Sequence, residues 1–172
     1  MYAAGDMVMH AGTGVCKIDE IRREDFGENG GQEYYVLRPI YENKSQIFVP
    51  VEKGDGRMRN LLSEEEIYTV LDAVPECNTI WVSDDRARQE KFSQVLHAGN
   101  RADVIKLISE LHEKRREVAK RGKRLHFADQ HVLEEAEKIV NQEVAYVFHL
   151  DIKDVPAFIM NRLGVQVSKV NS

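Results

Sequence analysis

Residues 63–81, SEEEIYTVLDAVPECNTIW, separate two halves of the chain that differ in hydrophobic periodicity. Ser63, followed three residues later by Glu66, forms the pattern of a capping box and predicts a helix start. Four apolar residues follow at helical spacing: Ile67, Val70, Leu71 and Val74. Pro75 cannot continue this helix, so residues 75–78 are predicted to be a linker.

The N-terminal half has the pattern of short strands joined by glycine-containing turns. The predicted strands cover residues 6–10, 15–21, 33–37 and 46–51. Gly12 and Gly14 permit a tight turn, and residues 27–31 form a glycine-rich loop. Pro50 cannot donate a hydrogen bond to a neighbouring strand, which predicts an edge position or a strand end. Four or five such strands indicate a small, strongly bent β-barrel.

The C-terminal half has helical periodicity with capping residues at the expected places. A Ser-Asp-Asp cap starts a second helix that ends at Gly99, and a third helix begins near Asn100. A fourth helix is predicted over residues 128–149, and a last short helix follows a cap at residues 151–154. We therefore expect an all-α module after the strands.

The predicted fold class is α+β, with two modules in one chain. The first module covers residues 1–75 and includes one helix that docks on the barrel. The helical module covers residues 79–164, and residues 165–172 are predicted to be a flexible tail. Such a design suggests a tether, in which each module holds a different partner.

The net charge of −5 conceals an asymmetry between the halves. Residues 1–77 contain 8 Lys+Arg against 15 Asp+Glu, whereas residues 78–172 contain 16 against 14. Seven cations lie within eleven residues and are opposed only by Glu117: Lys114, Arg115, Arg116, Lys120, Arg121, Lys123 and Arg124. This density of one sign favours contact with phosphate, and a solvated helix face is the ordinary alternative.

Several classes of protein are excluded by what the chain lacks. It has no run of about 18 apolar residues and no basic, apolar export signal at its start. A cytoplasmic location without a membrane partner is therefore expected. Cys16 and Cys77 have no nearby second cysteine and are predicted to be reduced thiols. The histidines are scattered, so neither a metal nor a cofactor is expected.

An enzyme is not expected either. Residues 12–14, Gly-Thr-Gly, lack a third glycine and a following helix, and no phosphate-binding loop with Gly-Lys-Ser/Thr occurs. No Ser or Cys has the local signature of a nucleophile. The chain is therefore predicted to act by binding.

The order of motifs resembles a known family, the CarD-type bacterial transcription regulators. The first module is similar to the N-terminal module that these proteins share with transcription-repair coupling factor, in residues 5–10, 12–15, 33–37 and 47–51. Trp81, the residues Arg86, Arg88, Lys91, Leu96 and Gly99, and the following helices resemble the C-terminal module. The resemblance covers about residues 1–160.

This resemblance implies a Tudor-like barrel that binds the RNA polymerase β subunit through an edge strand. The matching residues are Gln46, Ile47, Phe48, Val49 and Pro50, with Arg22 and Arg23, near the other end of the strands, as further candidates. It also implies that the helical module contacts promoter DNA weakly and without sequence specificity, and that Trp81 enters the minor groove at the edge of the melted region. The implied DNA-binding residues are Trp81, Arg86, Arg88, Lys91, Lys114, Arg115, Lys120, Arg121, Lys123 and Arg124.

The residues themselves also allow alternatives to this DNA role. A single Trp in a small helical domain is often a core anchor, and Arg86, Arg88 and Lys91 have acidic neighbours with which they can pair along their own helix. The chain also departs from the family in two places. Asp84 and Asp85 follow the Trp where basic residues are usual, and Phe48 stands where some members have an Arg.

The predicted function is modulation of open-complex stability at transcription initiation by a monomer that holds RNA polymerase and promoter DNA. The alternative is a protein–protein adaptor that binds RNA polymerase or another partner without contacting DNA. The salt dependence of affinity for promoter DNA distinguishes them. Contact with about three to five phosphates makes log affinity fall with log salt at a slope of roughly −0.9 per contact, whereas an adaptor shows no such slope.

Overall fold

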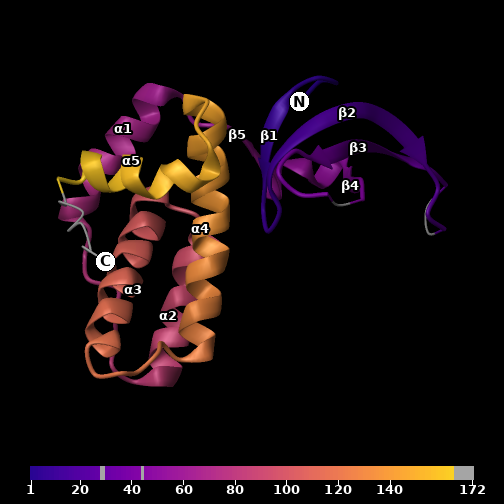
Figure 1. The fold of residues 1–172 in the computed structure, drawn as a ribbon. Coiled ribbons are helices and arrows are strands. Elements are labelled where there is room, and N and C mark those ends of the chain that lie inside the picture. Colours follow the sequence, from indigo (N-terminus) through magenta and orange to yellow (C-terminus); the bar gives the residue numbers. More distant parts are fainter. Residues whose placement is uncertain (28–29, 44, 165–172) are drawn as a thin grey trace. The chain divides into compact units, whose positions relative to one another are not determined.

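Residues 1–27, 30–43 and 45–164 are described by the computed structural model of this chain (Figure 1). The predicted flexible tail, residues 165–172, and the tip of the predicted loop at 28–29 lie outside the described residues. Contacts between residues divide the chain into two units, Met1–Leu62 and Ser63–Ser172. We call them the sheet unit and the helical unit.

The sheet unit contains one antiparallel sheet with the strand order β4-β3-β2-β1-β5. Its strands are β1 (Met7–His10), β2 (Gly14–Glu24), β3 (Gln32–Pro39), β4 (Ile47–Pro50) and β5 (Met58–Asn60). The four predicted strands are confirmed, whereas β5 was not recognised because only three residues form it. A 3-10 helix, η1 (Val51–Gly56), joins β4 to β5.

Side chains alternate along each strand, and a buried cluster lies on one face of the sheet. This cluster, the sheet core, comprises Val8, Cys16, Ile18, Tyr35, Leu37, Val49 and Met58. Met9, Val15 and Val36 on the other face are also buried. In the described residues the sheet is not closed, since β4 and β5 are its two edges. The predicted closure into a barrel is therefore not confirmed.

The helical unit consists of α-helices connected by short loops and 3-10 turns. Its elements are α1 (Glu64–Ala73), η2 (Val74–Glu76), α2 (Asp85–Ala98), α3 (Arg101–Ala119), α4 (Phe127–Phe148), η3 (Ile152–Asp154) and α5 (Val155–Arg162). Together with the sheet unit they confirm the α+β class.

Local capping explains where these helices begin and end. Ser63 accepts the Glu66 amide at 3.1 Å, and the Glu66 carboxylate accepts the Ser63 amide at 2.7 Å, so the predicted capping box is confirmed. Asp84 caps α2 by accepting the Ala87 amide at 2.8 Å. Gly99 ends α2 with φ 71°, a left-handed conformation that suits glycine.

Helices α2, α3 and α4 pack against one another, and α5 contacts both α1 and α4 (Figure 1). The buried cluster comprises Ile80, Phe92, Leu107, Leu111, Val132 and Leu133. Among the described helices, none combines the length and apolar composition needed to cross a membrane. Both cysteines, Cys16 and Cys77, are free thiols.

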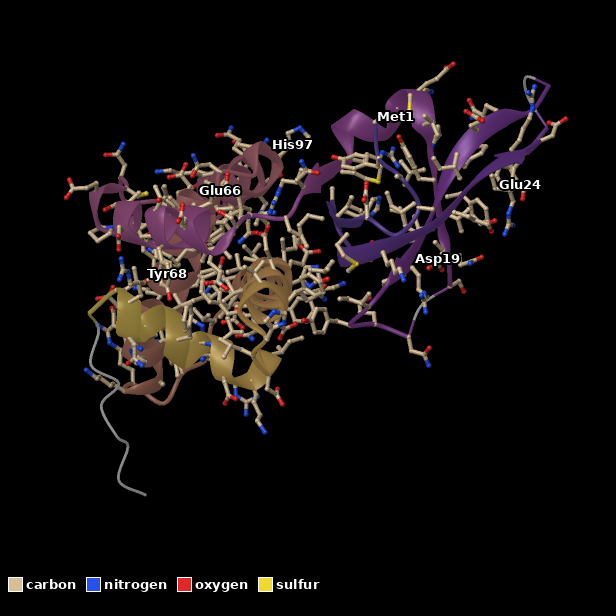
Figure 2. All side chains as sticks on the ribbon, turned by 90° about the horizontal axis from the view of Figure 1, so that it is seen from above. Met1, Asp19, Glu24, Glu66, Tyr68 and His97 are labelled. Carbon is tan, nitrogen blue, oxygen red and sulfur yellow. The ribbon has the colours of Figure 1, made fainter. Side chains whose placement is uncertain are left out.

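Helix α1 differs from its prediction. It packs against α3, α4 and α5, and Tyr68, labelled in Figure 2, contacts Phe148 and Phe158 with ring centroids 5.3 and 6.2 Å away. The boundary between units consequently lies after Leu62, before the helix that was expected to dock on the sheet. The apolar stripe was recognised correctly, but periodicity does not identify the surface that covers it.

Candidate functional site

Strand β4 is an edge of the sheet, as predicted, because among the described strands it pairs with β3 alone. Phe48 lies opposite Val36, and Pro50 lies opposite Tyr34. Val49 between them is buried in the sheet core, so Phe48 and Pro50 lie on the other face. An edge strand presents unpaired backbone groups, which allow a strand from another protein to be added.

The face opposite the sheet core carries three aromatic side chains beside this edge. Phe26 lies edge-on to Tyr34 and Phe48, with centroid distances of 5.1 and 5.5 Å, and Tyr34 and Phe48 are 6.3 Å apart. Phe26 is 63% exposed. We call Phe26, Tyr34 and Phe48 the aromatic patch. Tyr34 is 8% exposed, so Phe26 is the most accessible ring of the patch. Exposed aromatic rings such as that of Phe26 are common anchors of protein interfaces.

Arg22 lies on the same face as the aromatic patch. Its guanidinium carbon is 6.0 Å from the centroid of the Phe48 ring. Hydrogen bonds to Glu20 and Glu24 raise the pKa of Arg22. Arg22 had been expected near the other end of the strands from Phe48, but pairing through β3 brings the two side chains together.

The other residues predicted to bind polymerase are distributed around the same edge. Gln46 is exposed directly before β4, and Ile47 packs against the sheet core. Arg23 is exposed and donates a hydrogen bond to the Gly30 carbonyl at 3.5 Å. Of the predicted set, Phe48, Pro50 and Arg22 share the face that carries the aromatic patch.

In the helical unit, Trp81 is half-buried in the loop before α2. Its amide donates to the Glu110 carboxylate at 2.8 Å, and its ring centroid lies 6.3 Å from that of Phe92. Two cations approach the ring: the Arg88 guanidinium carbon at 4.5 Å and the Lys114 ammonium at 5.1 Å. Trp81 is therefore fixed against the core, while part of its surface remains accessible.

Arg88, which was predicted to contact DNA, is 3% exposed. It donates to both oxygens of Asp129, at 3.1 and 2.9 Å, to Asp85 at 2.7 Å, and to the carbonyls of Val82 and Ser83 at 3.2 Å. Burial acts to lower the pKa of Arg88, but the hydrogen bonds to Asp129 and Asp85 outweigh it and raise the pKa. These bonds give Arg88 a structural role in place of the predicted DNA contact.

The two neighbouring cations of α2 have different environments. Arg86 is 91% exposed at its side chain and lies 3.5 Å from Glu90 along the same helix. Lys91 donates to the Thr79 carbonyl at 3.0 Å and so fastens the loop that carries Trp81. Arg86 is the more accessible of the two for contact with a phosphate.

Asp84 and Asp85, which interrupt the basic pattern of the family, both have structural partners. Asp84 is the N-cap of α2. Asp85 binds Arg88, whose hydrogen bond lowers the pKa of Asp85, and its carboxylate also lies 3.8 Å from His126. Their negative charges are thus partly offset by groups of the helical unit itself.

The basic cluster lies on the last turns of α3 and in the connection to α4. Glu117 pairs with Lys114 at 3.3 Å and Arg121 at 3.9 Å, and Arg115 bonds His112 at 2.9 Å. Four exposed cations form no ion pair among the described residues: Arg116, Lys120, Lys123 and Arg124. We call residues 120–124 the basic loop. These four side chains are available to phosphates.

Trp81 and the basic cluster belong to the same end of the helical unit. Lys114 of the cluster lies over the Trp81 ring, and His126, which follows the basic loop, lies beside Asp85 in the first turn of α2. Figure 1 shows the connection between α3 and α4 at this end of the helices. Folding therefore brings together groups that lie more than thirty residues apart in the chain.

Comparison with known families gives a match for the sheet unit. The model of the CarD-like/TRCF RID domain matches residues 2–62. Such a domain implies RNA polymerase binding in transcription. The matched range coincides closely with the sheet unit, Met1–Leu62. No curated protein matches the chain.

The match confirms the resemblance of the N-terminal half, while a full CarD-type assignment, which includes the helices, stays a prediction. Two exposed aromatic residues were not singled out from the sequence: Phe26 and Phe127. Phe26 stands directly before the glycine-rich loop of the sheet unit, and Phe127 follows the basic loop after Leu125 and His126. The sequence signal that could have identified them is an aromatic residue close to a polar or glycine-rich loop.

Proposed function

We propose that this chain binds the RNA polymerase β subunit through its RID domain and promoter DNA through its helical unit. By holding both, it modulates the stability of the open promoter complex at initiation. It acts by binding and without catalysis. The observation that carries the proposal is the coincidence of the matched domain, at residues 2–62, with a sheet whose edge strand β4 is available for pairing.

Strand addition at β4 supports the polymerase contact. Main-chain hydrogen bonds supply affinity, while side chains on the two faces of the strand supply specificity. Phe48, with Arg22 beside it, presents an apolar surface where some family members present an ionic group. A partner surface that accepts it must offer apolar contacts in the same position.

Several features of the helical unit support the DNA contact. Trp81 is held by Glu110 and Phe92 with cations beside its ring, and the basic loop lies at the same end. A ring that enters the minor groove costs a few kcal/mol of unstacking, which is smallest where the strands already separate. Once the RID domain is bound, weak intrinsic DNA affinity suffices, because the second contact becomes intramolecular.

The proposal is tested by pull-down of purified bacterial RNA polymerase, followed by measurement of open-complex lifetime on one promoter. We expect Trp81→Ala to shorten the lifetime roughly 3- to 10-fold, a loss of about 1 kcal/mol, without weakening polymerase binding. Trp81→Phe retains the apolar contact with the core and controls for loss of folding. A normal lifetime with correctly folded Trp81→Ala, or no polymerase binding by the wild type, contradicts the proposal.

A protein–protein adaptor that does not contact DNA is the second candidate. The observation that favours it is that two cations near Trp81 are engaged within the helical unit. Arg88 is buried, and Lys91 donates a hydrogen bond to a backbone carbonyl. An adaptor bound to polymerase gives no additional salt dependence on promoter DNA. DNA contact by the basic cluster gives a slope of roughly −0.9 for each phosphate neutralised.

A further inference from the structure

Phe127 is the most exposed aromatic side chain in the described part of the helical unit, at 89%. It is the first residue of α4 and immediately follows the segment Lys123, Arg124, Leu125 and His126. Leu125, two residues earlier, packs against the buried cluster of the helical unit. The chain therefore packs one apolar residue of this segment against the core and leaves a larger one exposed to solvent.

The segment that presents Phe127 is held in a defined conformation. The amides of Gly122 and Lys123 donate to the carbonyls of Ala119 and Val118, at 2.9 and 3.0 Å. Gly122 has φ 69°, which allows the chain to turn back after α3. A pre-formed loop loses less conformational entropy when a ligand binds.

The charges near Phe127 are predominantly positive. The exposed cations Lys120, Lys123 and Arg124 form no ion pair among the described residues. Two acidic groups close to this segment are engaged by Arg88: Asp129 is buried against it, and Asp85 binds it as well. An anionic ligand therefore meets little competing negative charge from these two carboxylates.

We propose that Phe127 and the basic loop together hold a single strand of nucleic acid, with the phenyl ring stacked on an unpaired base. Cations that follow a backbone, combined with an aromatic ring for stacking, are the usual elements of single-strand binding. In a duplex the base faces are already covered by their neighbours, so the ring has a partner only where strands have separated. This inference rests on the proposed DNA role of the helical unit and adds to it a preference for melted DNA.

The test uses the full chain and two fluorescent probes, an oligo(dT) of about 20 nucleotides and a duplex of equal length, at about 50 mM salt. We expect the single strand to bind more tightly than the duplex. Phe127→Ala and Phe127→Leu should each weaken single-strand binding roughly 5- to 100-fold, whereas Phe127→Tyr should retain it, because stacking requires a ring. His97→Ala, an exposed change in the last turn of α2, should leave the affinity unchanged, because Asp85 near the basic loop lies at the other end of that helix.

Each outcome decides the inference. Absence of oligo(dT) binding by the wild type, or unchanged binding by Phe127→Ala, overturns it. Equal affinity of wild type and Phe127→Leu also overturns it, and indicates an apolar contact such as a protein partner makes. These results leave the proposed function standing if Trp81→Ala still shortens open-complex lifetime. Conversely, if the chain binds oligo(dT) through Phe127 but Trp81→Ala leaves the open-complex lifetime unchanged, only the proposed function is contradicted.

Discussion

Arg88 of α2 and Asp129 of α4 form a buried ion pair with two hydrogen bonds, Nε to Oδ1 at 3.1 Å and Nη2 to Oδ2 at 2.9 Å. The two residues are 3% and 1% exposed. The same guanidinium lies 4.5 Å from the Trp81 ring. The pair therefore joins two helices and supports the side chain that we propose to contact DNA.

Asp129→Asn should destabilise the helical unit, because it leaves the buried Arg88 charge with Asp85 as its remaining acidic partner. Breaking a buried pair of this kind typically costs about 3–5 kcal/mol, and we expect a value near the lower end. Urea unfolding followed by fluorescence of Trp81, the single tryptophan, measures the change. Arg86→Ala is the matched control and should change stability by less than about 0.5 kcal/mol, since Arg86 is exposed.

Ser63→Ala should remove the side-chain half of the capping box at the start of α1. The Glu66 amide then loses its acceptor at 3.1 Å, and we expect a loss of about 1 kcal/mol. Thermal unfolding followed by circular dichroism provides the measurement. Ser93→Ala, an exposed substitution within α2, serves as the control. Equal melting temperatures for Ser63→Ala and wild type would contradict a stabilising role for the cap.

Phe48→Ala should weaken polymerase binding by about 1–3 kcal/mol if the aromatic patch is an anchor of the interface. Phe48 touches Phe26 and Tyr34 on the face opposite the sheet core, so the effect on folding should be small. Affinity for immobilised polymerase is the readout. Ile40→Ala is the control, because Ile40 is also exposed and apolar but does not belong to the patch. Similar losses for both variants would show that the effect is not specific to the patch.

The pH dependence of the sheet unit should include a contribution from His10. Burial, with a smaller effect of Arg57, lowers the pKa of His10 below its ordinary value of 6.5. The unfolded chain thus binds the proton first as the pH falls. The contribution to stability is present above pH 6.5 and is lost as the pH falls through the folded-state pKa. NMR titration of the His10 ring checks this, and a midpoint at or above 6.5 would refute it.

Cys16 should react slowly with thiol reagents in the folded protein. Burial, and secondarily the negative charge of Glu42, raises the pKa of Cys16 to about 11, so little thiolate exists at neutral pH. Cys77 is only partly buried and should react first. Mass spectrometry after limited alkylation identifies the modified residue. Preferential labelling of Cys16 under native conditions would contradict the buried position of its side chain.

Much of the secondary structure could be predicted because its determinants are local. Asp84 and Gly99 define the ends of α2 through backbone hydrogen bonding within a few residues. Residues 46–51 were recognised as a short strand, and Pro50 correctly indicated an edge strand. The short strand β5 escaped prediction, since three residues show no recognisable period.

The candidate sites were predicted less completely because exposure depends on packing between distant residues. Arg88 and Arg86 look equivalent in sequence, yet one is buried against Asp129 and the other is exposed. Periodicity recognised the apolar stripe of α1 but assigned it to the sheet, whereas it packs in the helical unit.

The sequence by itself determined the order of the α-helices and of the strands other than β5, the caps at Ser63 and Asp84, the position of the basic cluster and the resemblance of residues 2–62 to the RID domain. These features follow from neighbouring residues, whose chemistry is visible along the chain. The tertiary structure alone decided that Arg22 lies beside Phe48, that Arg88 forms a buried ion pair with Asp129, and that Phe127 is exposed to solvent. Each depends on which surfaces pack together, and burial is a property of the whole fold.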